Sequence, residues 1–313
     1  MNRRKKRNIS SIYTEEMDKS TPYRLFGKPV QIKRMGCEHD NWPGQPIPPS
    51  VNVFVKVTNG CNAHCRFCSN GGAAHTGSFN IGKLLEVLYE TGHNGIRVNR
   101  LNITGGEPSC VPRLVERILE HMDEPPFDSI HVHLNTNGLL PASQALMKHP
   151  RWDSISVSLH HYERAKLSEL YGVHIPDTAI SFEGVNPMKV NASCNLIKGY
   201  IDSTAEAQRM MDFCLDHDFT RLGFVGLMPV NDYCRQHLVE LDELHLEEIP
   251  HCYFTESQHR GKDCRCSNYL YNKHLKVLDI YMRHYVNPSY CESSLLFDGE
   301  YLRQGFYEDN IIY

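Results

Sequence analysis

The chain has 313 residues, which is enough for one large α/β domain with an appendage or for two domains. Apolar residues make up 41% of it and charged residues 22%, as is ordinary for a globular protein in water. The formal net charge of −4 gives no general electrostatic attraction to nucleic acid, because binding to phosphates needs clustered positive charge.

Neither a membrane anchor nor a secretion signal is expected. No apolar run approaches the roughly 18 residues that span a bilayer, and no apolar segment follows the basic run at residues 3–7, which is interpreted as a solvated tail. We therefore expect a cytoplasmic protein with no membrane or nucleic-acid partner. In a reducing compartment, its twelve cysteines indicate metal or redox chemistry rather than disulfides.

Residues 1–50 are polar and are expected to form an N-terminal extension with a short strand within residues 27–35. From residue 51 onward, strand-like apolar runs alternate with amphipathic, helix-like runs. The predicted strands are 51–57, 96–104, 129–135, 154–160, 188–197 and 221–229, and the predicted helices are 80–92, 111–122, 142–149, 162–172 and 203–218, with Ser203 as the cap of the last one.

This alternation predicts an α/β fold. The strands are rich in Val, Ile and Leu, as expected for parallel strands buried on both faces. We predict a partial (β/α)6 barrel over residues 51–244, followed by a small β-containing, cysteine-rich module over residues 245–313. In such folds the chemistry lies at the C-terminal ends of the strands.

Polar and glycine-rich segments follow the predicted strands at those ends. They are the cysteine loop after the first strand, TGGEP at 104–108, NTNG at 135–138, Ser158 with the histidines at 160–161, Asn195, and LMPVND at 227–232. Their recurrence after strand upon strand indicates one site built along this edge.

Three cysteines lie close together in the loop after the first strand, at Cys61, Cys65 and Cys68. A structural zinc ion usually has four ligands, and the loop offers no fourth one. Three thiolates on a cubane cluster leave one iron open to substrate or cofactor. The alternatives are a zinc site completed by the distant Cys37 and a chance grouping in an unrelated α/β protein.

The CxxxCxxC spacing, followed by GGEP after the second strand, resembles the radical S-adenosylmethionine (radical SAM) superfamily over residues 51 to about 230. The resemblance implies that Cys61, Cys65 and Cys68 hold a [4Fe–4S] cluster whose open iron binds SAM. It also implies a set of contacts to SAM: Phe67 to the adenine; Gly105, Gly106 and Glu107 to the methionine amino group; Ser158 and Met228, as in the molybdenum-cofactor GTP cyclase branch; and Asn135.

The resemblance further implies the reaction. An electron from a donor such as flavodoxin or ferredoxin cleaves SAM to methionine and a 5′-deoxyadenosyl radical, which takes a hydrogen atom from an unactivated C–H bond. The protein orients the reactants and excludes water.

The C-terminal cysteines resemble the ligands of the one-cluster auxiliary module called Twitch, a shortened SPASM domain. We expect one auxiliary [4Fe–4S] cluster held by Cys264, Cys266 and Cys291, with Cys252 as the fourth candidate ligand. Reduced structural cysteines and a zinc site are the alternatives. The CxC spacing and the ending DNIIY depart from the GTP cyclase, so GTP cyclisation is not assigned.

Cys234 follows the last strand and could return a hydrogen atom to a substrate radical, as radical epimerases require; the alternative is a plain loop thiol. The function expected is dehydrogenation, epimerisation or rearrangement of a small metabolite such as a sugar, aminoglycoside, nucleoside or amino-acid derivative. A maturase of a ribosomally made peptide and a non-catalytic iron–sulfur sensor are the other two hypotheses.

Overall fold

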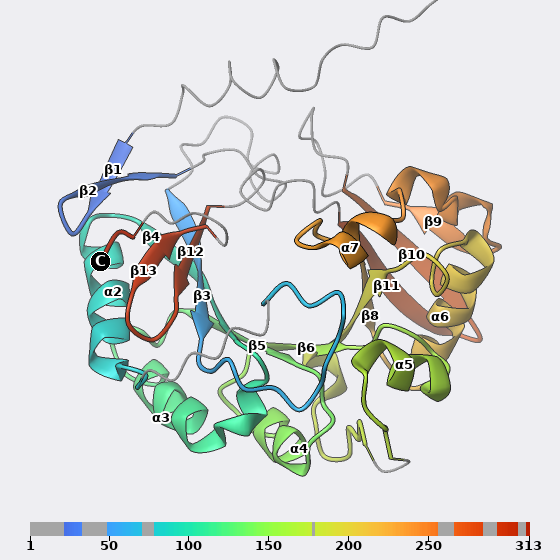
Figure 1. The fold of residues 1–313 in the computed structure, drawn as a ribbon, viewed down its shortest axis with the longest axis horizontal. Coiled ribbons are helices and arrows are strands. Elements are labelled where there is room, and N and C mark those ends of the chain that lie inside the picture. The colour runs from blue at the N-terminus through green and yellow to red at the C-terminus, as the bar shows by residue number, and fades with distance from the viewer. Residues whose placement is uncertain are drawn as a thin grey trace, which may run out of the picture.

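The computed structural model describes residues 22–32, 49–70, 78–176, 179–255, 266–283, 293–305 and 311–313. Its main feature is one curved sheet of eleven strands in the order β13-β12-β3-β4-β5-β6-β7-β8-β11-β10-β9 (Figure 1). A separate hairpin joins β1 (Pro22–Leu25) to β2 (Lys28–Gln31), where the short N-terminal strand was predicted.

Six consecutive parallel strands form the centre of the sheet and confirm the predicted βα order. They are β3 (Ser50–Lys56), β4 (Arg97–Thr104), β5 (His131–Thr136), β6 (Ser154–Ser158), β7 (Val190–Leu196) and β8 (Arg221–Gly226). Because all six run the same way, the segments that follow them meet along one edge of the sheet.

Helices lie along the outside of the curved sheet (Figure 1). They are α2 (Ile81–His93), α3 (Pro112–Met122), α4 (Pro141–Met147), α5 (Arg164–Tyr171) and α6 (Thr204–Asp216). Ser203 caps α6 as predicted, because its hydroxyl accepts a hydrogen bond of 3.3 Å from the Glu206 amide. Shorter helices connect the remaining elements: η2 (Pro108–Cys110), η3 (Pro187–Lys189), α7 (Asp232–Gln236), η4 (Leu241–Glu243) and η5 (Leu246–Glu248).

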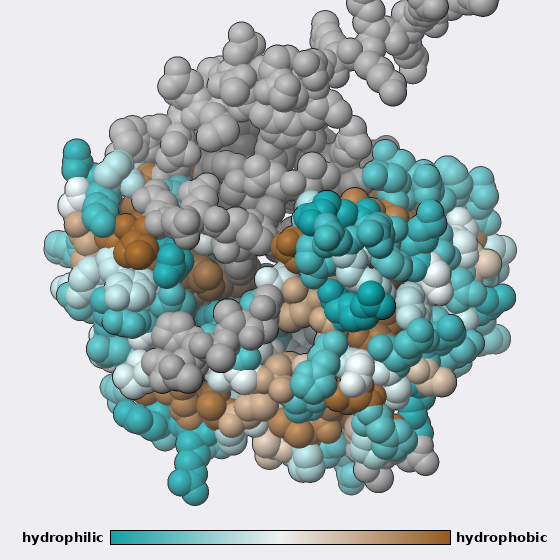
Figure 2. All heavy atoms as spheres, viewed as in Figure 1, coloured by the Kyte–Doolittle hydropathy of each residue, from teal (hydrophilic) through white to brown (hydrophobic). Residues whose placement is uncertain are grey.

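The two faces of the central strands differ, which the sequence interpretation missed. Val53, Val55, Leu101 and Ile103 are fully buried and join the core beneath the helices. The alternate positions are mostly polar and line the concave side. Examples are Asn52 on β3 and its register partner Arg100 on β4. In the described part of the chain, the long helices that connect these strands cover the convex side. Space-filling atoms show this view hollowed near its centre, with hydrophilic residues over α5, α6 and β9 (Figure 2).

The C-terminal strands extend both edges of the central sheet. On one side β11 (Lys276–Arg283) pairs parallel to β8, followed outward by β10 (Ser267–Lys273) and β9 (Cys252–Phe254). On the other side β12 (Ser294–Phe297) pairs parallel to β3, and β13 (Leu302–Gln304) follows it. The β content expected after residue 245 is present, and it is continuous with the barrel sheet. Within the described parts of the chain, no helix is long and apolar enough to cross a bilayer.

Candidate active site

The three-cysteine loop leaves β3 at the C-terminal edge of the sheet. Cys61 is exposed, and Cys65 and Cys68 are half-buried. Burial, and then the neighbouring Cys68 and Cys61, raise the pKa of the Cys65 thiol to about 12. The thiols are thus close enough to oppose each other's ionisation, although no three His, Cys, Asp or Glu side chains in the described ranges already converge as a metal site. Three neighbouring thiolates therefore require a cationic centre to be stable together.

The GGE segment after β4 clamps the start of this loop. The amide of Gly106 donates to the Thr58 carbonyl at 2.6 Å, and that of Glu107 donates to the Gly60 carbonyl at 2.8 Å. A Cβ atom on Gly106 would lie 2.2 Å from the Gly60 carbonyl oxygen, and one on Gly105 would lie 2.4 Å from that of Thr58. The two glycines thus allow two backbones to touch, which fixes the position of the cysteine loop.

Glu107 is buried, with 1% of its surface exposed. Both of its carboxylate oxygens accept hydrogen bonds from protein groups. One oxygen accepts from the Ser109 amide at 3.0 Å, the Ser109 hydroxyl at 2.6 Å and the Thr136 hydroxyl at 2.7 Å. The other accepts from the Asn137 amide at 2.7 Å. In this structure the carboxylate ties the ends of β4 and β5 together, and a contact to a ligand ammonium would be additional to these bonds.

Glu107→Gln should lower the free energy of unfolding by about 2 to 3 kcal/mol. Glutamine has one accepting oxygen where glutamate has two, and its side-chain nitrogen cannot accept, so at least one buried donor loses its partner. Denaturant titration of the variant measures this loss, with Glu116→Gln on the exposed face of α3 as the matched control. The control should change stability by less than about 0.5 kcal/mol. Equal stability of the two variants would contradict the anchor role.

Asn137 connects this anchor to the cysteine loop. Its side-chain nitrogen donates to the Asn62 side-chain oxygen at 2.8 Å and lies 3.9 Å from the Cys61 sulfur. The sequence interpretation chose Asn135 from the NTNG motif, but Asn135 lies on the concave face beside His133. The residue of the motif that reaches the loop is thus the one just beyond the strand, where a turn redirects the chain.

Phe67 and Cys234 belong to a small apolar cluster beneath the loop, with Leu170, Ile197 and Leu227. The Cys234 thiol is fully buried and donates to the Phe67 carbonyl at 3.6 Å. Asn231, which caps α7, donates to the Arg66 carbonyl at 3.0 Å. The segment after β8 therefore supports the cysteine loop from below.

The two histidines after β6, His160 and His161, are both buried. The His160 ring meets Phe67 edge-on with centroids 4.9 Å apart, and its Nδ1 accepts from the Asn195 amide at 3.1 Å. Burial lowers the pKa of His160 to about 4. His160 is therefore neutral at physiological pH and positions Phe67 without adding charge.

His133 on β5 should make the protein sensitive to acid. Burial, and then Arg100 and His131, lower the pKa of His133 from 6.5 to about 3. Between these values the unfolded chain binds the additional proton, so this contribution to stability is full above about pH 6.5 and falls as the pH drops. From pH 7 to pH 5 the loss should be about 2 kcal/mol. Urea titrations at both pH values measure it, and a His133→Asn variant with an unchanged pH slope would contradict it.

The other predicted SAM contacts lie along the same edge of the sheet. Ser158 ends β6 half-buried, and its carbonyl accepts from the Tyr171 hydroxyl. Met228 follows β8, also half-buried, and its carbonyl accepts from the Val230 amide at 2.8 Å. The fold thus brings both residues to the edge that carries the cysteine loop.

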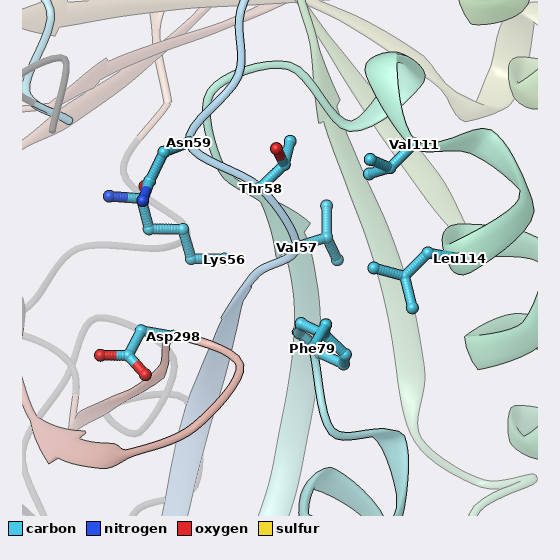
Figure 3. Close-up of a pocket in the computed structure, with 8 residues that line it drawn as sticks. All are labelled: Lys56, Val57, Thr58, Asn59, Phe79, Val111, Leu114 and Asp298. Atoms are coloured by element: carbon cyan, nitrogen blue, oxygen red, sulfur yellow. The ribbon is translucent and has the colours of Figure 1, made fainter. Parts of the chain in front are cut away.

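A pocket of about 230 Å³ adjoins the start of the cysteine loop (Figure 3). Lys56, Asn59 and Asp298 form its polar wall, and Val57, Phe79, Val111 and Leu114 form the apolar one. Burial lowers the pKa of Lys56, whereas Cys68 and Asp298 oppose that shift. A cation thus stands next to the cysteine loop, where it would offset thiolate charge.

The candidate auxiliary ligands are only partly described. Cys264 and Cys291 lie outside the described residues, whereas Cys252 and Cys266 lie within them. Cys252 pairs with Tyr271 across β9 and β10, five residues from Cys266, which is about 17 Å of strand. Metal–thiolate bonds are only about 2.3 Å long. Cys252 therefore cannot share a cluster with Cys266 in this structure, and its buried thiol belongs to the core.

Comparison with known proteins identifies the family. The family model described as the Radical SAM superfamily matches residues 55–229, more than half of the chain. The chain is a member of the radical SAM superfamily. Membership implies a [4Fe–4S] cluster that binds SAM, and the chain fits this group through its three-thiol loop and the close-packed glycines beside it.

Relatives of different activity share this resemblance. A probable GTP 3′,8-cyclase of Metallosphaera sedula is 29% identical over 58% of this chain and 57% of its own length. A probable dual-specificity RNA methyltransferase RlmN of Clostridium botulinum is 22% identical over 72% of this chain and 65% of its own. The crystal structure of a radical SAM methyltransferase from Sphaerobacter thermophilus has a TM-score of 0.50 and 18% identity, over 64% of this chain and 62% of that one. The chain spans little more than half the length of the cyclase, so the specific reaction does not transfer by similarity.

Proposed function

We propose that this radical SAM enzyme abstracts a hydrogen atom from an unactivated C–H bond of a small metabolite and so dehydrogenates, epimerises or rearranges it. The observation that carries the proposal is the cysteine loop, which the GGE segment clamps at the C-terminal edge of a sheet whose alternate positions are mostly polar. When bound, the cluster and SAM supply a 5′-deoxyadenosyl radical. The chain's own residues bind and orient the reactants and exclude water.

Each residue has a proposed task at this edge. Cys61, Cys65 and Cys68 would hold the cluster, and Phe67, fixed by His160, would line the adenine. Gly105 and Gly106 keep the loop in place and leave backbone groups near the methionine end, with Glu107 as their anchor. The half-buried Ser158, Met228 and Asn135 would complete the cofactor site.

The short polar side chains of the concave face support a small hydroxylated substrate. The alternate positions of β6 are Ser154, Ser156 and Ser158, whose short side chains leave room, and Ser156 and Ser158 offer hydroxyl groups. A ribosomal peptide remains the second candidate, and RNA is a third one because an RNA methyltransferase is among the relatives. A sensor without catalysis would not need the buried Phe67–His160 contact at the predicted adenine side.

Cofactor turnover distinguishes these candidates. The reconstituted enzyme is incubated without oxygen with SAM and reduced flavodoxin or ferredoxin, and 5′-deoxyadenosine is quantified. Small metabolites, peptides and RNA from the source cells are added as separate fractions. The proposal predicts that the small-metabolite fraction stimulates 5′-deoxyadenosine formation above the rate without substrate. Stimulation by the peptide or RNA fraction alone would overturn it.

We propose a second [4Fe–4S] cluster held by Cys264, Cys266 and Cys291. Cys252 is not included, because its partner on β10, Tyr271, lies five residues from Cys266. Such a cluster could accept an electron from a substrate radical or bind the substrate through its open iron. Iron analysis should find about eight irons in the wild type and about four in Cys264→Ala/Cys266→Ala. About four irons in both proteins would contradict the second cluster.

For Cys234, the proposed return of a hydrogen atom requires the thiol to leave its contact with the Phe67 carbonyl. Cys234→Ala should then form less product and incorporate less solvent deuterium into it. Full product with unchanged deuterium would leave Cys234 as a residue that only supports the loop.

A further inference from the structure

The concave face of the central sheet has an unusual chemical composition. Strand register places Asn52, Arg100 and His131 side by side on this face, and Asn102 and His133 lie two residues further along. From β3 to β7, the alternate positions of this face include no Asp or Glu within the described strands. They are mainly Asn, Ser, Thr and His, together with the cations Lys56 and Arg100. These strands therefore contribute two cations, no carboxylate and many hydrogen-bonding groups to the face.

Arg100 is the cation on this face that stands apart from acidic partners. It is half-buried on β4, and among the residues that the structure describes no carboxylate forms an ion pair with it. Its charge contributes to the low pKa of His133, which places the guanidinium near that ring. By contrast, Lys56 at the upper end of β3 interacts with Asp298. A half-buried guanidinium without a carboxylate partner is suited to bidentate pairing with an external oxyanion.

Asn102 provides an independent observation beside it. The residue is 3% exposed, yet no acceptor in the described part of the chain reaches its side-chain nitrogen. Leaving such a buried donor without a partner costs about 1 to 3 kcal/mol. Native proteins rarely keep one unless it has a purpose. An acceptor on a bound ligand would satisfy it.

The two histidines next to Asn102 and Arg100 already have a hydrogen-bond partner, so they do not compete for the ligand. The Ser154 hydroxyl lies 2.7 Å from His131 Nε2 and 2.7 Å from His133 Nδ1, so it bridges the two rings. This bridge holds both histidines in place along the side of Asn102 and Arg100.

We propose that this face binds an oxyanion of the substrate, either a carboxylate or a phosphate, with Arg100 pairing to the charge and Asn102 donating from its side-chain nitrogen. This inference rests on the proposed function, because it names the class of its substrate. Asn102 lies two residues, or about 7 Å, below Thr104 at the end of β4. An anchor at this depth leaves the rest of a metabolite-sized molecule at the edge where the cysteine loop lies. Polycationic substrates such as aminoglycosides are disfavoured by the same charges.

Direct anion binding tests the proposal without any turnover. The thermal stability of the reconstituted protein is followed against inorganic phosphate and, separately, malonate, with chloride at equal ionic strength as reference. Three variants are compared: Arg100→Gln, Asn102→Leu, and Arg97→Gln, an exposed arginine on the same strand. We expect at least one of the two probes to stabilise the wild type and Arg97→Gln, and Arg100→Gln to bind it about tenfold or more weakly. The probe that binds shows whether the anion is a phosphate or a carboxylate.

Asn102→Leu separates a ligand contact from a structural one. Without a probe it should melt at a higher temperature than the wild type, because an unpartnered buried donor is removed, and it should bind the anion more weakly. Anion binding that is equal in wild type and Arg100→Gln, or no binding at all, would overturn the proposal. 5′-Deoxyadenosine formed without substrate is measured on the same samples. Its absence in the wild type would defeat the proposed function and leave the anion result to be judged separately.

Discussion

Cys65→Ala is expected to abolish formation of 5′-deoxyadenosine and to remove the iron and sulfide of the SAM-binding cluster. Two remaining thiolates cannot hold a cubane that three hold with one iron open. The effect should be complete, because Cys65 lies between the other two cysteines in a loop that other elements hold in place. Iron and sulfide analysis, together with chromatography of the reaction products, measures both losses.

Cys110→Ser is the matched control for this experiment. Cys110 is exposed. Desolvation, and then the nearby Glu107 and Cys61, raise the pKa of its thiol, so Cys110 lies beside the loop without belonging to the triplet. The control should keep its iron and its activity. If Cys110→Ser lost the cluster and Cys65→Ala kept it, the ligand assignment would be wrong.

Gly106→Ala should have the second largest effect, a loss of about 3 kcal/mol in stability together with poor cluster incorporation. The new methyl carbon would lie 2.2 Å from the Gly60 carbonyl oxygen and 2.6 Å from that of Asn59. Both contacts are with backbone, which cannot move aside as a flexible side chain can. The clamp must open, and the cysteine loop would lose its position.

Gly92→Ala on α2 is the control, because no atom lies within 4 Å of its added carbon. Alanine favours a helix, so this control should be neutral or more stable by up to about 1 kcal/mol. Denaturant titration and iron content are measured for both variants. Normal stability and iron content in Gly106→Ala would show that the close approach is not needed.

The sequence predicted the central strands and helices well because both depend on local pattern. Apolar runs of strand length alternate with amphipathic runs, and Ser203 is a strong local cap. The cysteine triplet and GGEP are local as well, so the edge that carries the site could be predicted. The glycines were assigned to the cofactor, and the structure adds a cause that sequence alone does not reveal, namely their contact with the Thr58–Gly60 backbone.

Features that depend on distant contacts could not be predicted. Nothing in residues 267–283 or 294–304 indicates that they pair with opposite edges of one sheet. The same limit explains Cys252, whose distance from Cys266 follows from the register of β9 on β10. Asn137 directly follows β5, where the chain turns, but its partner Asn62 lies 75 positions away in the sequence.

The central claim is tested most directly by the products of SAM in the wild-type protein. The protein is reconstituted without oxygen and incubated with SAM and dithionite, and 5′-deoxyadenosine, methionine, iron, sulfide and zinc are quantified in one sample. The account predicts at least about four irons and four sulfides per chain, with 5′-deoxyadenosine and methionine formed in equal amounts. Zinc without sulfide, with SAM left intact, would contradict it.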